Sequence, residues 1–378
     1  MKYRDFGRSG ARVSLLGFGA MRLPVTGEGE NQRVDLDRAV PLLQQGLDAG
    51  INYLDTAWAY LNETSETAVG AALAGRDRNR VYISTKNPIN TEPVEYRKRL
   101  DSQLRKLKTD YIDFYHIHGL NWTVYQYKAK PKGYLDLLLK AKAEGLIRHL
   151  SFSSHDTPAN IMKLILTGDF DSMLVQFNLL HRYNEAAIRL AAEKGMGVAV
   201  MGPMGGGRIT FLSRLKPREG RSLAELALRF VFSHPHVGVT LSGMNTPEMI
   251  EENVKTADRD GPLTAVEKED ITLMLDQIQG LEDLYCTGCG YCMPCPQGVD
   301  IPTNLLILNY IRIYGSQKNF QEGFVQLYHK RLIPQGQAAE ACIECETCLE
   351  KCPQQIAIPE RMREVASELS RFKPEAVA

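Results

Sequence analysis

The sequence predicts a closed (β/α)8 barrel followed by a small helical domain, and three observations support this prediction. From residue 13 to about residue 256, short apolar runs alternate with amphipathic helical patterns, as in parallel strands joined by helices. Eight such strand–helix pairs fit into about 250 residues, which is the usual size of a closed barrel. All 8 cysteines come after residue 285, so the C-terminal part differs in kind.

The eight predicted strands are short apolar runs that alternate with the helical patterns. They are residues 14–20, 51–57, 81–86, 111–118, 149–154, 172–178, 197–203 and 237–243. Helical spacing is clear between them at 36–50, 94–107, 186–195 and 222–232. An open doubly wound sheet is the alternative. Such a sheet has fewer strands, and a glycine-rich fingerprint usually follows its first strand. The first strand here ends in Gly17-Phe18-Gly19-Ala20-Met21, with no third glycine at the required offset, so the barrel is favoured.

Helix starts are marked by residues that cap an N-terminus, either directly before a proline or three residues before a glutamate. The pairs are Thr157-Pro158, Thr246-Pro247, Ser222 with Glu225, and Thr264 with Glu267. The last pair begins one more helix after the eighth unit, and this helix ends near Gly280. We therefore expect a barrel domain of residues 1–280 and a helical domain of residues 281–378.

The charges of the chain argue against two classes of partner. Lys+Arg and Asp+Glu both number 45, so no basic field attracts nucleic acid or anionic membrane. No run reaches 18 apolar residues, and the N-terminus lacks the apolar core of a signal peptide. We expect a cytoplasmic protein, and in a reducing compartment closely spaced thiols are more often metal ligands or redox groups than disulfides.

Four polar residues fall where such a barrel carries catalytic groups, at the C-terminal ends of strands and in the following loops. They are Asp55, Lys86 and His118, which close the second, third and fourth predicted strands, and Tyr60 in the loop after Asp55. Neighbouring strands lie about 4.8 Å apart, so these side chains can meet around one small volume. Taken singly, each has a structural explanation: a salt bridge, a packed aromatic ring or a capped strand end.

Together the four residues suit the reduction of a carbonyl group. A buried lysine beside a tyrosine favours the phenolate and lowers the pKa of the phenol, while an aspartate keeps the ammonium charged and in place. Tyr60 then becomes a usable proton donor. His118 can hydrogen-bond to the carbonyl oxygen of a substrate and orient it.

In order and spacing, Asp55, Tyr60, Lys86 and His118 resemble the catalytic tetrad of the aldo-keto reductases. The resemblance covers roughly residues 1–280 and includes an N-terminal segment similar to the hairpin that closes the barrel bottom. It implies a (β/α)8 TIM barrel that binds NADPH without a Rossmann motif and transfers hydride between NAD(P)H and a small carbonyl or alcohol substrate. It also implies that Tyr60 is the general acid, that Lys86 and Asp55 tune it, and that His118 orients the carbonyl.

The resemblance further implies cofactor contacts at the ends of the strands and in the loops beyond them. They are Met21, Ser153, Ser154, Gln176, Gly202, Gly205, Gly206, Gly243, Asn245, Glu252 and Asn253. A glycine-rich loop and a helix N-terminus both present backbone N–H groups to a pyrophosphate. Where many members have Ser-Asn after the fifth strand, this chain has Ser153-Ser154-His155. Met249 stands where an arginine often binds the 2′-phosphate, so NADP(H) and NAD(H) both stay open. An apolar substrate pocket could be walled by Met21, Trp58, Leu120 and Trp122.

The cysteines form two runs of four, each followed directly by a proline. They are Cys286, Cys289, Cys292 and Cys295, and Cys342, Cys345, Cys348 and Cys352. The second run resembles the bacterial ferredoxin run, in which three thiolates hold one 4Fe-4S cluster and the fourth binds the other cluster. Carried over, this resemblance implies one cluster on Cys286, Cys289, Cys292 and Cys352, and another on Cys342, Cys345, Cys348 and Cys295.

Two zinc sites or disulfides are the alternatives for these thiols. Ile301, Ile343, Ile356 and Ile358 stand near the cysteines and would exclude water from clusters. Helical spacing between the two runs makes the tail similar to an α-helical ferredoxin-like domain. The whole chain thus resembles the subgroup of aldo-keto reductases that carries such a C-terminal domain.

The leading hypothesis is an oxidoreductase that moves hydride at Tyr60 and has two 4Fe-4S clusters for one-electron transfer, with a possible redox partner protein. Hydride carries two electrons and a cluster carries one, so direct exchange needs a mediator such as a flavin, and the sequence has no flavin motif. One alternative is a reductase whose clusters are only structural or oxygen-sensing. Another is an electron-transfer subunit whose barrel binds nucleotide without catalysis.

Overall fold

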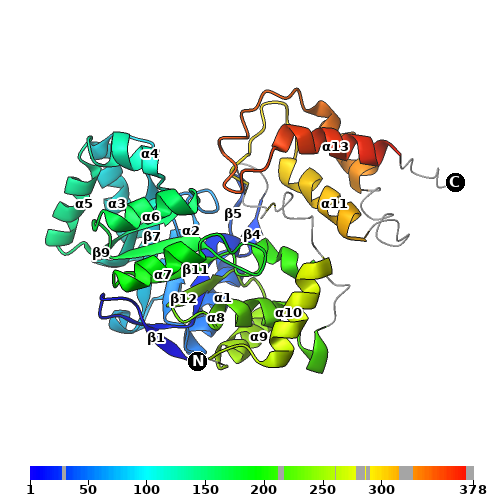
Figure 1. The fold of residues 1–378 in the computed structure, drawn as a ribbon. Coiled ribbons are helices and arrows are strands. Elements are labelled where there is room, and N and C mark those ends of the chain that lie inside the picture. The colour runs from blue at the N-terminus through cyan, green and yellow to red at the C-terminus, as the bar shows by residue number, and fades with distance from the viewer. Residues whose placement is uncertain are drawn as a thin grey trace. The chain divides into compact units, whose positions relative to one another are not determined.

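A computed structural model of the chain describes residues 1–27, 31–211, 217–259, 261–277, 286, 290–314 and 327–371. The chain divides into two compact units, Met1–Met204 with Pro217–Lys268, and Gly205–Lys216 with Glu269–Ala378. The first unit is built on a closed barrel, and the second contains the helices of the C-terminal region (Figure 1).

Eight parallel strands close the barrel. They are β3 (Leu16–Gly19), β6 (Tyr53–Asp55), β7 (Tyr82–Pro88), β8 (Ile112–His118), β9 (Ile147–Ser154), β10 (Ser172–Gln176), β11 (Gly197–Met201) and β12 (Val239–Ser242). They pair in chain order, and β12 pairs with β3 to complete the ring. Each strand overlaps one of the eight predicted runs, so the barrel prediction is confirmed.

One main helix follows each strand and covers the outside of the barrel (Figure 1). In order these are α1 (Leu36–Asp48), α2 (Ser65–Ala72), α3 (Pro93–Leu107), α5 (Tyr134–Ala143), α6 (Pro158–Leu166), α7 (Glu185–Glu193), α8 (Leu223–Phe232) and α9 (Pro247–Ala257). The additional helix predicted after the eighth unit is α10 (Ala265–Gln277). Its capping box forms in full, since Glu267 N donates to Thr264 Oγ1 (3.1 Å) and Thr264 N donates to Glu267 Oε2 (2.8 Å).

A hairpin closes the N-terminal end of the barrel, as the resemblance implied. Its strands β1 (Tyr3–Asp5) and β2 (Arg12–Ser14) are antiparallel, and Phe6 in the turn is fully buried. The Phe6 ring packs so closely that a Cβ on Gly197 would lie 2.5 Å from it, and a Cβ on Gly238 would lie 2.6 Å from it. Phe6 also meets Phe114 edge to face, with 4.9 Å between ring centroids. Side chains therefore close the end of the barrel where the strands begin, and the opposite end is formed by the C-terminal ends of the strands.

Several short elements were not predicted, because each is too short to show a periodic pattern. They are the paired strands β4 (Val25–Thr26) and β5 (Arg33–Val34), helix α4 (Trp122–Val124), the π-helix η4 (Tyr125–Ala129), and the 3-10 segments η1 (Ala20–Arg22), η3 (Arg78–Arg80), η5 (Gly205–Phe211) and η6 (Arg218–Gly220). Most of them lie in the loops that follow strands.

The C-terminal region is helical, as predicted. Its elements are α11 (Ile301–Tyr314), the π-helix η8 (Tyr328–Leu332), the 3-10 segment η9 (Ala339–Ala341) and α13 (Ile358–Ser370). Helices α11 and α13 pack against each other around buried residues such as Leu305, Leu308 and Val365. Among the described residues, no helix is both long enough and apolar enough to cross a membrane.

Candidate functional site

Asp55 and Lys86 form a buried ion pair at adjacent strand ends. Asp55 is the last residue of β6, and Lys86 lies near the end of β7. Lys86 Nζ donates to Asp55 Oδ1 (2.5 Å) and to the Thr56 carbonyl oxygen (2.7 Å), while Ser84 Oγ donates to Asp55 Oδ2 (2.7 Å). Lys86 is 1% exposed and Asp55 is 4% exposed. A pair this buried needs such added hydrogen bonds to offset desolvation.

Tyr60 and His118 lie beside this pair. The Lys86 Nζ atom is 4.8 Å from the centroid of the Tyr60 ring. The Tyr60 and His118 rings meet edge to face, with 5.9 Å between centroids and 82° between planes. His118 ends β8, the next strand after β7 in the barrel, so three consecutive strands and one loop bring the four predicted side chains together.

The electrostatics of the site set the protonation state of His118. Burial, together with the nearby Lys86 charge, lowers the pKa of His118 to about 3. Burial also raises the pKa of Asp55, although Lys86 and Ser84 act in the opposite direction. At neutral pH His118 is therefore an uncharged imidazole, which donates a hydrogen bond but carries no acidic proton to transfer.

His116 is a second histidine inside the barrel, which the sequence analysis did not single out. It lies opposite Lys86 in the pairing of β7 with β8 and is fully buried. Burial is the main reason that its pKa is lowered to about 3. The sequence already indicated this position, because His116 and His118 are two residues apart on one strand and so point to the same face.

We expect His116 to make the barrel less stable in acid. The unfolded chain protonates this histidine near pH 6.5 and the folded chain only near pH 3, so the free energy of unfolding falls as pH drops through that range. Between pH 7 and pH 5 the loss from this one group is about 2 kcal/mol. The measurement is urea unfolding followed by tryptophan fluorescence. His116→Gln should flatten the pH dependence, the exposed control His236→Gln should not, and an unchanged slope in His116→Gln would contradict the expectation.

Three of the predicted cofactor contacts occupy the ends of the next two strands. Ser153 and Ser154 end β9, Gln176 ends β10, and all three are buried. Ser153 Oγ accepts a hydrogen bond from Gly119 N (2.9 Å), and Ser154 Oγ accepts one from Asp156 N (3.2 Å). These side chains continue around the same end of the barrel as the tetrad.

Two of the predicted glycines directly follow barrel strands. Gly202 comes after β11 and has φ +64°, and a Cβ there would lie 3.7 Å from Gln176 Cγ. Gly243 comes directly after β12, and a Cβ on this residue would lie only 3.2 Å from Arg22 Cβ, so the glycine leaves room for the Arg22 side chain. Gly205 and Gly206 belong to η5, which groups with the second unit. Met21 lies in η1, after β3, and is partly buried.

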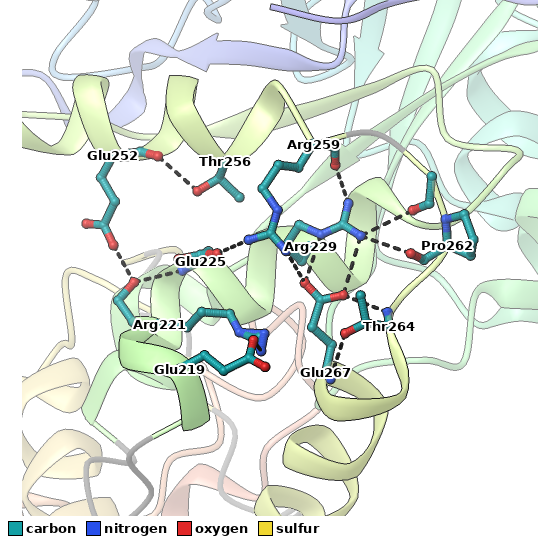
Figure 2. A network of polar contacts seen from close by, with 12 residues as sticks. Glu219, Arg221, Glu225, Arg229, Glu252, Thr256, Arg259, Pro262, Thr264 and Glu267 are labelled. Carbon is teal, nitrogen blue, oxygen red and sulfur yellow. Dashed lines mark hydrogen bonds and ion pairs between the residues drawn. The ribbon is translucent and has the colours of Figure 1, made fainter.

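Helix α9 carries Glu252 and Asn253, and a polar network fixes its position (Figure 2). Arg229 of α8 donates through Nε to Glu267 Oε1 (3.1 Å), and Arg259 Nη2 donates to the same oxygen (3.0 Å). Glu252 accepts a hydrogen bond from the Ser222 hydroxyl. The network ties α8, α9 and the start of α10 together.

The remaining predicted contacts differ in exposure. Asn253 is 2% exposed and its Nδ2 donates to Ser242 Oγ (3.1 Å) at the end of β12, whereas Asn245 in the intervening loop is exposed. Leu120 is buried, and Trp122 stacks on Tyr125 with 5.4 Å between centroids. Leu120, Trp122 and Asn245 follow the C-terminal ends of β8 and β12, the end that carries the tetrad, and Asn253 lies farther along in α9.

Two cysteines of the first run line one pocket with three of the second. A single pocket of the C-terminal unit is lined by Cys295, Cys342, Cys345 and Cys348 together with Cys292, Ile301, Ile358 and Met362, among others. Cys286 and Cys292 are buried in the apolar core of this unit, and Cys352 packs against that core. Cys289 lies outside the described residues. Burial raises the pKa of Cys348, and the nearby thiols of Cys342, Cys295 and Cys345 raise it further, so these four thiols lie close together. Which cysteines bind which cluster stays a prediction.

The donor set fits a 4Fe-4S cluster. Glu344 and Glu346, which flank Cys345, have φ of +56° and +59°, and left-handed residues are part of the backbone nests that bind anionic clusters. The Thr347 hydroxyl lies 3.4 Å from Cys345 Sγ and lowers the pKa of that thiol, which favours the thiolate ligand. No group of three or more Cys, His, Asp or Glu within the described ranges is placed to share a single metal ion. Cubane thiolates bind different irons and stand farther apart than ligands of one ion.

Three of the four isoleucines expected to exclude water are buried. Ile301, Ile356 and Ile358 are at most 4% exposed. Ile343 is 63% exposed, but it also lines the pocket of Cys342, so it covers that pocket only in part.

Both the barrel region and the C-terminal region match known protein families. Residues 15–272 match the aldo/keto reductase family, and residues 285–357 match a 4Fe-4S dicluster domain. An uncharacterised oxidoreductase of Bacillus subtilis is 26% identical over 68% of this chain and 91% of its own length. An NADH-specific methylglyoxal reductase of Escherichia coli is 25% identical over 75% of this chain and 100% of its own length.

Solved structures show the same relationship. An aldo-keto reductase from Bacillus halodurans, in its holo form, superposes with a TM-score of 0.62 at 29% identity, covering 72% of this chain and 96% of that protein. The closed barrel of this chain is thus shared with a solved aldo-keto reductase. The chain belongs to the aldo/keto reductase family and carries a C-terminal 4Fe-4S dicluster domain.

Proposed function

We propose that the barrel catalyses hydride transfer between NAD(P)H and a small carbonyl or alcohol substrate. The observation that carries this proposal is the grouping of Asp55, Tyr60, Lys86 and His118 at one end of the barrel, with Lys86 Nζ 2.5 Å from Asp55 and 4.8 Å from the Tyr60 ring. An ammonium, a phenol and a neutral imidazole around one volume suit a carbonyl oxygen that gains negative charge and then a proton.

Each residue of the tetrad has a separate task. The Tyr60 hydroxyl gives its proton to the carbonyl oxygen, and the Lys86 ammonium stabilises the phenolate that remains. Asp55 keeps that ammonium charged and fixed through the 2.5 Å hydrogen bond. His118, neutral because its pKa is lowered to about 3, donates a hydrogen bond to the same carbonyl oxygen and orients it. A bound nicotinamide would supply the hydride.

The nicotinamide cofactor is bound by residues at the strand ends and in the segments that follow the strands. They are Met21, Ser153, Ser154, Gln176, Gly202, Gly205, Gly206, Gly243, Asn245, Glu252 and Asn253. The buried hydroxyls and amide of Ser153, Ser154 and Gln176 suit the amide of a nicotinamide. Met249 is 43% exposed and brings no positive charge to the 2′-phosphate position, so NADH is used at least as well as NADPH.

The two cysteine runs hold two 4Fe-4S clusters. Cys295, Cys342 and Cys345 all raise the pKa of Cys348, which supports one cluster on these four thiols. Cys286 and Cys292 are buried in the core against which Cys352 packs, which supports the other cluster. Such clusters supply one-electron transfer, so the C-terminal domain serves a redox partner protein. A reducing cytoplasm keeps the thiols available as ligands.

The test of the barrel activity is isotope transfer. NADH and NADPH deuterated at the transferable C4 position are each incubated with the purified chain and a panel of small aldehydes. The panel includes methylglyoxal, because a relative reduces it. One deuterium on the carbon of each new alcohol is the expected result. Alcohol without deuterium, or no alcohol with any aldehyde of the panel, would refute the proposal.

A further inference from the structure

The backbone directly after Tyr60 is unusual. Leu61, Asn62 and Glu63 have φ of +51°, +51° and +64°, so three consecutive residues with a Cβ are in the left-handed region. Each such residue costs free energy relative to the right-handed region. A run of this kind persists only where surrounding contacts over-determine it, and these runs are concentrated at functional sites.

Local hydrogen bonds hold part of this loop. The Thr64 hydroxyl donates to the Leu61 carbonyl oxygen (2.6 Å) and accepts from Val34 N (3.0 Å). Asn62 Nδ2 donates to the Gln32 carbonyl oxygen (3.0 Å). These bonds fix the end of the loop that leads into α2, but none of them reaches the residues before Tyr60.

Side chains on one face of α3 contact residues that come before and after Tyr60 in the chain. Arg99, Gln103 and Lys106 are four and three residues apart, so they lie on one face of the helix, and they are called the α3 row below. Lys106 Nζ is 3.9 Å from the centroid of the Trp58 ring, two residues before Tyr60. The same Nζ is 3.7 Å from Glu63 Oε2, three residues after Tyr60.

The Lys106 ammonium lies among two carboxylates and one aromatic ring. Its Nζ atom is buried and makes no hydrogen bond to any described residue. It interacts through charge with Glu63 and with fully buried Glu66 (3.9 Å), and with the face of the Trp58 ring. A desolvated cation in this setting attracts a ring face and carboxylates more strongly than an exposed one does.

The α3 row also reaches Lys86. Gln103 Nε2 donates to Glu66 Oε1 (2.6 Å) and lies 3.2 Å from the Lys86 carbonyl oxygen, which also accepts from Trp58 N (2.9 Å). One carbonyl oxygen therefore joins the strand of Lys86, the loop of Tyr60 and helix α3. Helix α2 packs so closely on α3 that a Cβ on Gly70 would collide with Lys106 O, so the backbone of Lys106 is itself fixed.

We propose that Lys106 is a positioning residue for Tyr60. Its ammonium holds Trp58 and Glu63, which stand on either side of Tyr60 in the chain, and so keeps the phenol near Lys86. Lys106 acts only through these two neighbours. The inference rests on the proposed function, since it assigns Tyr60 the role of proton donor.

Steady-state kinetics of three variants test this inference. Lys106→Met keeps the length of the side chain and removes the charge, and it should lower kcat about 10-fold with KM within about twofold, because small displacements of a reacting group are costly. In the pH profile of kcat for carbonyl reduction by Lys106→Met, the fall at alkaline pH should move to higher pH. The reason is that the Tyr60 phenol is deprotonated less readily when it lies farther from Lys86. Lys106→Arg should recover most of the activity, since arginine also stacks on indole rings. Lys98→Met, on the exposed side of α3, should match the wild type.

A fluorescence measurement separates this inference from the proposed function. The chain has 2 tryptophans, so in a Trp122→Phe background the emission reports on Trp58 alone. Lys106→Met should increase acrylamide quenching of Trp58 at least twofold, and Lys98→Met should leave it unchanged. Unchanged quenching, or unchanged kcat and pH profile, would overturn the role of Lys106 alone. Absence of carbonyl reduction in the wild type would overturn the proposed function.

Discussion

Replacing Tyr60 by phenylalanine is expected to lower kcat for carbonyl reduction by about 10²–10⁴-fold, the usual contribution of a general acid. The variant removes one hydroxyl and keeps the ring that meets His118 edge to face at 5.9 Å and lies 4.8 Å from Lys86 Nζ. Cofactor binding and stability should therefore change little. Tyr127→Phe is the matched control, because Tyr127 is 72% exposed, and it should have wild-type kcat.

The role of Lys86 can be separated from that of Tyr60 by a double-mutant comparison. Removing Lys86 alone would leave a buried, uncompensated Asp55 and destabilise the fold, so the charge-free pair Lys86→Met with Asp55→Asn is the better variant. If the pair acts only by tuning Tyr60, adding Tyr60→Phe to it should cost little further activity. Losses that multiply would show that Lys86 and Asp55 act on the substrate independently. A Tyr60→Phe enzyme with wild-type kcat would place the proton donor elsewhere.

The sequence was sufficient for the barrel and for the positions of the four tetrad residues, for one physical reason. Parallel barrel strands are buried on both faces, so they read as short apolar runs, and a polar residue at the end of such a run is conspicuous. Asp55 and His118 end their strands as expected, while Lys86 lies two residues before the end of β7. Chain order and barrel order coincide, which is why residues on consecutive predicted strands are neighbours in space.

The supporting contacts could not be predicted in the same way. Leucine and glutamate give no sign of a left-handed backbone, so the loop of Leu61 and Glu63 was invisible. The hydrogen bond of Gln103 to Glu66 joins two helices that packing alone brings together. Ser222 and Glu225 had the spacing of a capping box, but only the serine caps.

The half-formed box has a specific cause. The carboxylate of Glu225 pairs with Arg259 instead of reaching back to the start of its own helix (Figure 2). Local sequence rules predict local contacts, and here a tertiary ion pair competes successfully for the same carboxylate. The same limit applies to Ser84, whose hydrogen bond to Asp55 crosses from one strand to the next and has no local signature.

Replacing Cys295 by alanine is expected to remove the cluster bound by the second cysteine run, although Cys295 belongs to the first. The reason is that Cys295 lines one pocket with Cys342, Cys345 and Cys348, as Cys292 also does, and that Cys295, Cys342 and Cys345 all raise the pKa of Cys348. Anaerobically purified wild type should contain about eight irons and eight acid-labile sulfides per chain, and Cys295→Ala about four. Zinc in place of iron would contradict the cluster assignment.

Iron content of one single variant does not identify which cluster is lost, but pairs of variants do. If Cys295 and Cys345 bind the same cluster, the double variant Cys295→Ala with Cys345→Ala keeps about four irons, because both changes affect one cluster. The double variant Cys352→Ala with Cys345→Ala should then lose nearly all its iron, because the changes affect both clusters. If each run instead bound its own cluster, the two results would be reversed. The pocket shared by Cys295 and the second run predicts the first pattern, and the iron analysis of these two proteins decides between them.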